Sequence, residues 1–72
     1  MKKELFEKVL SGCKEAVIHL KKESIPKFFY SKDIYYLACN TDCFDMHFKG
    51  EDGRGDNYCF FYKNVTSIEV YR

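Results

Sequence analysis

The sequence predicts an α+β protein, mainly β, in which one N-terminal amphipathic helix precedes a five-stranded, strongly bent antiparallel sheet or small barrel. Three observations support this prediction. Apolar residues recur at helical spacing through the first third of the chain. From residue 27 onwards, short aromatic and β-branched runs alternate with turn residues. In the closing segment, 58–72, two such runs flank a short polar break at Lys63-Asn64, which is typical of the last strands of a small β-barrel.

The first expected element is a helix over about residues 2–22. Its apolar residues follow the i, i+3, i+4, i+7 rule, and they are Leu5, Phe6, Val9, Leu10, Cys13, Ala16, Val17 and Leu20. Only Ile18 falls outside the apolar arc of this helix. A competing interpretation ends a shorter helix at Gly12 and starts a strand near Ala16, because the segment 16–20 is rich in β-forming residues. The long helix is the preferred prediction.

The β region is expected over about residues 27–71, after Pro26 turns the chain away from helix. Segments 27–31 and 34–40 flank Lys32-Asp33, which predicts a hairpin turn. The glycine-rich, acidic segment 50–57 predicts a mobile hairpin loop.

Segment 43–49 has the cleanest alternation in the chain and predicts a strand with two different faces. One face carries Phe44, Met46 and Phe48, and the other carries Cys43, Asp45, His47 and Lys49. The first face is expected to be buried, and the second to meet water or a ligand.

Length and composition limit the function classes. Seventy-two residues allow one domain with a modest core, so oligomerisation is expected. Apolar residues make up 46% and aromatic residues 18%, while the formal charge is +1, so no global field favours nucleic acid or an acidic membrane. No catalytic motif stands out, and we expect neither an enzyme nor a bound cofactor. The N-terminus has no apolar run typical of a signal peptide, and no segment is apolar enough to span a bilayer, which predicts a cytoplasmic protein with reduced cysteines.

Potential metal ligands gather between residues 39 and 47. Cys39, Cys43, Asp45 and His47 include thiolate, carboxylate and imidazole donors, and the last three share a strand face. Their spacing matches no paired zinc motif, so a solvated strand face with free thiols is preferred and no metal is expected.

Three short segments resemble the Hfq branch of the Sm-like RNA-binding proteins. Leu20-Lys-Lys-Glu-Ser-Ile-Pro26 is similar to that family's basic helix end, and Asp42-Cys-Phe44 to its Asp-Gln-Phe turn. Tyr62-Lys-Asn-Val-Thr-Ser-Ile68 is similar to its Tyr-Lys-His-Ala-Ile-Ser segment, with Asn64 in place of the histidine. The resemblance implies a small Sm-like barrel, related in architecture to SH3-like barrels, that assembles into a ring and binds uridine-rich single-stranded RNA.

Carried over residue by residue, the resemblance implies a uridine site at Phe44, Lys63 and Asn64. It also implies a lateral RNA-binding rim at Lys21 and Lys22, and a distal-face contact at Tyr30. An aromatic ring can stack a base, a lysine can meet phosphate and an asparagine can read a base edge. The alternative is that both aromatic residues serve packing and that Lys63-Asn64 is simply a turn.

Two other interpretations remain open. The strand-ending pattern from Phe61 to Val70 also resembles bacterial pleckstrin-homology-like and GRAM-like modules, although those place their helix after the strands. The excess of aromatic residues at near-zero charge is typical of protein interfaces, which predicts a protein-interaction or inhibitor module of phage or mobile-element type as the functional alternative.

Overall fold

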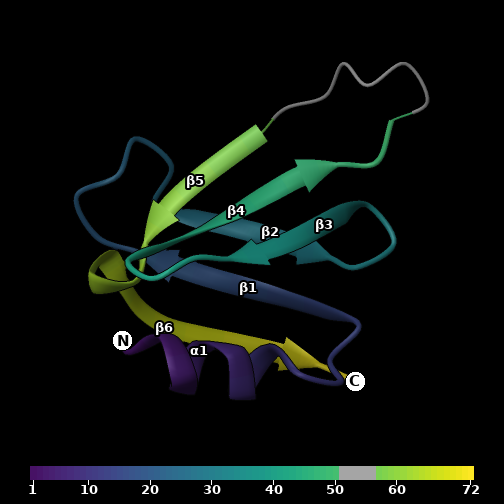
Figure 1. The fold of residues 1–72 in the computed structure, drawn as a ribbon, viewed down its shortest axis with the longest axis horizontal. Helices are drawn as coiled ribbons and strands as arrows, with labels where there is room; N and C mark the ends of the chain where they lie inside the picture. Colours follow the sequence, from purple (N-terminus) through teal and green to yellow (C-terminus); the bar gives the residue numbers. More distant parts are fainter. Residues whose placement is uncertain (51–56) are drawn as a thin grey trace.

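The computed structural model describes residues 1–50 and 57–72 (Figure 1). Within these residues the chain forms one short helix, six strands and one 3-10 turn. In chain order the elements are α1 (Lys3–Leu10), β1 (Glu15–Leu20), β2 (Lys27–Ser31), β3 (Tyr35–Cys39), β4 (Cys43–Phe48), β5 (Asn57–Phe61), η1 (Tyr62–Asn64) and β6 (Val65–Tyr71). The predicted order of an N-terminal helix followed by antiparallel strands is confirmed.

The strands pair into two three-stranded antiparallel sheets, with strand orders β2-β1-β6 and β3-β4-β5. Figure 1 shows the two sheets facing each other, with α1 beside β6. Across residues 1–50 and 57–72 the strands do not close into a hydrogen-bonded barrel, so the prediction of five strands in one bent sheet or barrel is wrong in this respect. The chain crosses between the sheets twice, at the turn before β3 and at η1, and neither crossing pairs its flanking strands.

The predicted helix over residues 2–22 is wrong beyond Leu10, and the competing interpretation is confirmed. Gly12 has a φ of +76°, a conformation that glycine adopts without strain, and it separates α1 from β1. Along β1, Ala16, Ile18 and Leu20 are buried, whereas the residues between them are only partly covered. Period-two burial explains why Ile18 did not fit the helical arc.

The predicted turn at Lys32-Asp33 is present, but the hairpin is not. The amide of Ile34 donates to the carbonyl of Ser31 at 3.0 Å, which closes the turn. However, β2 pairs with β1 and β3 pairs with β4, so the turn connects two different sheets.

The two-faced strand predicted over residues 43–49 is confirmed as β4. Phe44 and Met46 are fully buried, and Phe48, near the end of the sheet, is 43% exposed. Of the predicted loop 50–57, residues 51–56 lie outside the described residues. No helix in the described chain is long and apolar enough to cross a membrane.

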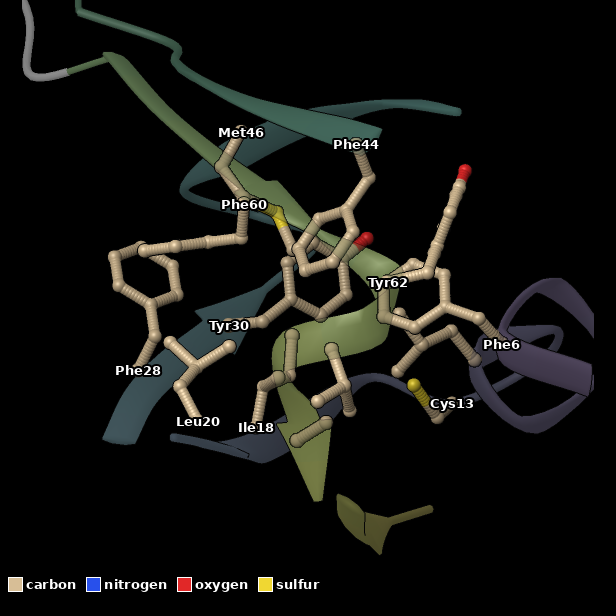
Figure 2. Packing of buried hydrophobic residues seen from close by; sticks show 13 residues of the cluster. Phe6, Cys13, Ile18, Leu20, Phe28, Tyr30, Phe44, Met46, Phe60 and Tyr62 are labelled. Carbon is tan, nitrogen blue, oxygen red and sulfur yellow. The ribbon is translucent and has the colours of Figure 1, made fainter. Parts of the chain in front are cut away.

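The core lies between the two sheets and is rich in aromatic rings (Figure 2). Phe6 of α1 is fully buried, with its ring stacked on Phe44 at 4.1 Å between centroids and 5.3 Å from the ring of Tyr62. At the other side of the core, Phe28 of β2 packs against Tyr58 of β5 at 4.7 Å. Helix α1 therefore contributes a central core ring that packs on β4 and η1, and the helix itself lies beside β6.

Candidate functional site

The two aromatic residues implied by the RNA-binding resemblance lie in the core. Phe44 is 0% exposed and Tyr30 is 6% exposed. Phe44 is packed against Phe6, Phe60 and Tyr62 (Figure 2). Neither ring therefore presents a free face on which a base could stack.

The four polar residues implied by the resemblance come from two loops that meet at one end of the molecule. Lys63 and Asn64 are part of η1, and Lys21 and Lys22 follow β1. The amide of Lys21 donates to the carbonyl of Asn64 at 2.8 Å, and the Asn64 side-chain amide donates to the carboxylate of Glu23 at 3.0 Å. Lys22 adopts a φ of 57° and is exposed. The structure thus brings these residues together, with the Asn64 amide already engaged.

A cavity of about 490 Å³ lies at this end, between the start of α1, the β3–β4 connection and the end of β5. It is lined by Met1, Lys2, Lys3, Glu4, Thr41, Asp42, Phe61, Tyr62 and Lys63. Of these, only Lys63 was a candidate from the sequence. The sequence does not indicate Lys2 and Lys3, because helical periodicity places both on a solvated face. Nothing in the local pattern shows that the start of the helix packs beside η1.

The exposed ring in this cavity is Phe61, which is 47% exposed. The Lys63 ammonium lies 5.6 Å from the centroid of the Phe61 ring, in a cation–π arrangement. Buried Tyr62 lies between them in the chain, its hydroxyl donating to the carbonyl of Asn40 at 2.8 Å and its carbonyl accepting from the Met1 ammonium at 3.1 Å. Burial raises the pKa of the Tyr62 phenol, so this hydroxyl stays protonated and the hydrogen bond holds η1 in place.

The charges around the cavity favour an anion. Lys2, Lys3 and Lys63 line it against two acids, Glu4 and Asp42. The Lys3 ammonium also lies 3.9 Å from the Glu7 carboxylate in an exposed ion pair. Such a pair is weak, so it leaves most of the attraction of Lys3 for an anion in the cavity. A chain of net charge +1 thus places a local excess of positive charge beside an exposed aromatic ring.

A second group of chemically active side chains lies on the outer face of β4 and β5. The ligand atoms of Cys43, Asp45 and Cys59 are all within 4.8 Å of one another. A hydrogen bond to the Asp45 carboxylate raises the pKa of the Cys59 thiol to about 12, and the same contact lowers the pKa of Asp45. Of the metal-ligand candidates from the sequence, Cys43 and Asp45 are in this group.

The other two candidates are placed differently. Cys39 pairs across the strands with buried Phe44, and burial raises the pKa of its thiol. His47 shares the outer face of β4 but is not one of the three clustered ligands. Cys59, which the sequence did not indicate, joins the group because β5 pairs with β4 in a register that sets it opposite Asp45.

Comparison with known proteins finds no matching family model, no matching curated protein and no matching solved structure. The functional argument therefore depends on the residues themselves.

Proposed function

We propose that this protein is a non-catalytic RNA-binding module that holds single-stranded RNA at the cavity beside η1. The observation that carries the proposal is the Lys63 ammonium over the half-exposed ring of Phe61, in a cavity that also contains Lys2 and Lys3. Single-strand binding sites combine an aromatic ring that stacks a base with cations that meet the backbone. A cavity of about 490 Å³ is within the size range of sites that take small ligands, so it has room for one nucleotide.

In this proposal each side chain has a distinct role. A base stacks on Phe61, while Lys63 and the lysines at the start of α1 neutralise neighbouring phosphates. Phe61 takes the stacking role that the Hfq-type resemblance assigned to Phe44, which lies in the core. The resemblance supports the same class of ligand, because one of its matching segments begins with Tyr62-Lys63-Asn64, the residues of η1.

One such site binds weakly, and self-association would repeat it and raise the overall affinity through avidity. A cytoplasmic location is part of the proposal, and it is compatible with the four cysteines being free thiols.

The proposal is tested by fluorescence anisotropy with a labelled uridine-rich oligonucleotide. We expect Phe61→Ala to weaken binding by about 1–3 kcal/mol, a factor of roughly 5 to 140 in Kd. The matched control is Phe29→Ala, because Phe29 is also a half-exposed strand aromatic, 48% against 47%, but lies on β2 away from the cavity. The control is expected to bind RNA as the wild type does.

A second pair of variants tests the charge. Lys63→Ala is expected to reduce the slope of log K against log salt by about 0.7, the contribution of one phosphate contact on a single strand. Lys14→Ala, a change of an exposed lysine just before β1, is expected to leave the slope unchanged. Equal losses in Phe61→Ala and Phe29→Ala, or binding insensitive to salt, would refute the proposal.

A second candidate function is protein interaction through the strand edges, with another copy of this chain as the first partner. Its supporting observation is that each edge strand carries one exposed aromatic residue: Phe29 on β2, Tyr36 on β3, Phe61 on β5 and Tyr71 on β6. Exposed edges beside apolar side chains favour strand addition. Light scattering coupled to size exclusion tests self-association in both candidates. A strict monomer that still binds RNA excludes the self-assembly interpretation and the avidity contribution, and leaves the single RNA site.

A further inference from the structure

The outer face of β4 and β5 brings together two thiols and a carboxylate from three positions. Asp45 lies directly opposite Cys59, and Cys43 precedes Asp45 by two residues on the same face of β4. The two sulfur atoms and a carboxylate oxygen all lie within 4.8 Å of one another. Three metal-ligating groups this close together are more than a solvated strand face needs.

The register disfavours a direct disulfide between the two cysteines. Cys43 is paired with Phe61 and Asp45 with Cys59, so Cys43 and Cys59 are diagonal neighbours. Diagonal neighbours on antiparallel strands have Cα atoms about 7–8 Å apart, beyond the roughly 7 Å that a disulfide spans without backbone movement. A metal ion bound between the two sulfur atoms is not subject to this limit on the Cα–Cα distance.

The separation of the donors suits a zinc ion. With Zn–S bonds of about 2.3 Å, two thiolates in a tetrahedral site have sulfur atoms roughly 3.8 Å apart. Side-chain rotations that bring the donors about 1 Å closer than 4.8 Å are therefore enough to complete the three bonds. Two thiolates and one carboxylate are a soft, nitrogen-free donor set that suits Zn²⁺ better than the oxygen-seeking Mg²⁺ or Ca²⁺.

The surroundings of the cluster hold its carboxylate in position. The side-chain amide of Asn40 donates to Asp45 Oδ2 at 2.8 Å and lies 3.8 Å from Cys43 Sγ. This amide contacts two of the three donors, as supporting groups around metal ligands commonly do. On the other side of Asp45, the paired residue of β3 is Ala38, which has a small side chain without a polar group.

We propose that Cys43, Asp45 and Cys59 bind one Zn²⁺ ion, with water in the fourth coordination position. Binding releases the two thiol protons, and Asn40 acts as a positioning residue for the Asp45 carboxylate. The ion cross-links β4 to β5, which are neighbours in the β3-β4-β5 sheet. A metal ion that links two strands adds stability to a domain too small for a large core.

The test uses the untagged, full chain, reduced and freed of metal. Titration with Co²⁺ is expected to give thiolate-to-cobalt charge-transfer absorption that saturates at one ion per chain and is abolished by one equivalent of Zn²⁺. Cys43→Ser and Cys59→Ser are each expected to lower Zn²⁺ affinity at least tenfold in a chelator competition. The control is Cys39→Ser, which removes a thiol that packs on the core side of β3 and is expected to retain the full signal.

Two further measurements separate loss of zinc binding from poor folding of a variant. In the wild type, one equivalent of Zn²⁺ is expected to raise the melting temperature, and this shift is lost in Cys59→Ser, whose side chain is exposed. Asn40→Ala is expected to keep the thiolate absorption while Zn²⁺ affinity falls by roughly 10- to 100-fold. Absence of the charge-transfer band in the wild type, or an equal loss of binding in Cys39→Ser and Cys59→Ser, would overturn the proposal.

Discussion

Replacement of Phe6 by alanine tests whether the short helix α1 is held in place by its central ring. Phe6 is 0% exposed, and its ring contacts Phe44 at 4.1 Å and Tyr62 at 5.3 Å. Truncation removes a full aromatic ring between a strand and η1, neither of which can collapse freely into the space. Phe→Ala changes of this kind cost about 3–5 kcal/mol.

That loss is large for a domain of this size. At about 0.05–0.15 kcal/mol per residue, a 72-residue chain has a free energy of unfolding of roughly 4–11 kcal/mol. With a urea m-value of about 1 kcal/mol/M, the unfolding midpoint of Phe6→Ala is expected to fall by roughly 3 M or more. Phe6→Leu, which keeps most of the apolar volume, is expected to cost about 1–2 kcal/mol and serves as a variant that still folds.

Leu5 provides the matched control on the same helix. Its side chain is 50% exposed, so Leu5→Ala is expected to change stability by no more than about 0.5 kcal/mol. Urea denaturation followed by far-ultraviolet circular dichroism measures all three variants. If Phe6→Ala costs no more than Leu5→Ala, the helix is not packed as described and the account of the core is wrong.

Three further changes have definite expected outcomes. Gly12→Ala places a Cβ at a φ of +76° and is expected to destabilise by about 1 kcal/mol in urea denaturation, so an unchanged midpoint would count against the turn described here. Tyr62→Phe removes the hydroxyl that donates to the Asn40 carbonyl and is expected to cost about 1 kcal/mol by the same measurement, with no loss expected if that bond is absent in solution. Hydrogen bonding to His19 lowers the pKa of the Glu69 carboxyl from its ordinary value, so the ionised carboxylate contributes stability above the unfolded-state pKa. This stability is lost as the pH falls through the folded-state pKa. Glu69→Gln is therefore expected to lose less melting temperature than the wild type between pH 5 and pH 3, and equal losses would show that the pair contributes nothing.

The sequence predicted the β region well because burial there follows a simple alternation. Phe44 and Met46 are buried on one side of β4, and Cys43 and Asp45 lie on the other, as period two requires. The helix predicted for the N-terminal third continued too far because Ala16 and Leu20 satisfy both helical and strand spacing. Only Val17 and Ile18 distinguish the two within β1.

Sheet pairing could not be predicted from local pattern. A tight turn at Lys32-Asp33 is compatible both with a hairpin and with a crossing between two sheets. Tertiary packing decides between them. The same limit applies to both candidate sites, since Phe61 joins Lys2 and Cys59 joins Cys43 only through long-range contacts. Residue type was enough to indicate Lys63 as a candidate. It was not enough for Phe44, because a strand aromatic can face the core, and Phe44 does.

The location of RNA contact tests the central claim most directly. Two-dimensional ¹H–¹⁵N spectra recorded while a uridine-rich oligonucleotide is added report on each backbone amide separately. We predict that the largest shifts fall on Lys2, Lys3, Phe61 and Lys63, the residues around the cavity, and that the amide of Phe29 on β2 does not move. Shifts centred on β2, or no shifts at low salt, would contradict the account.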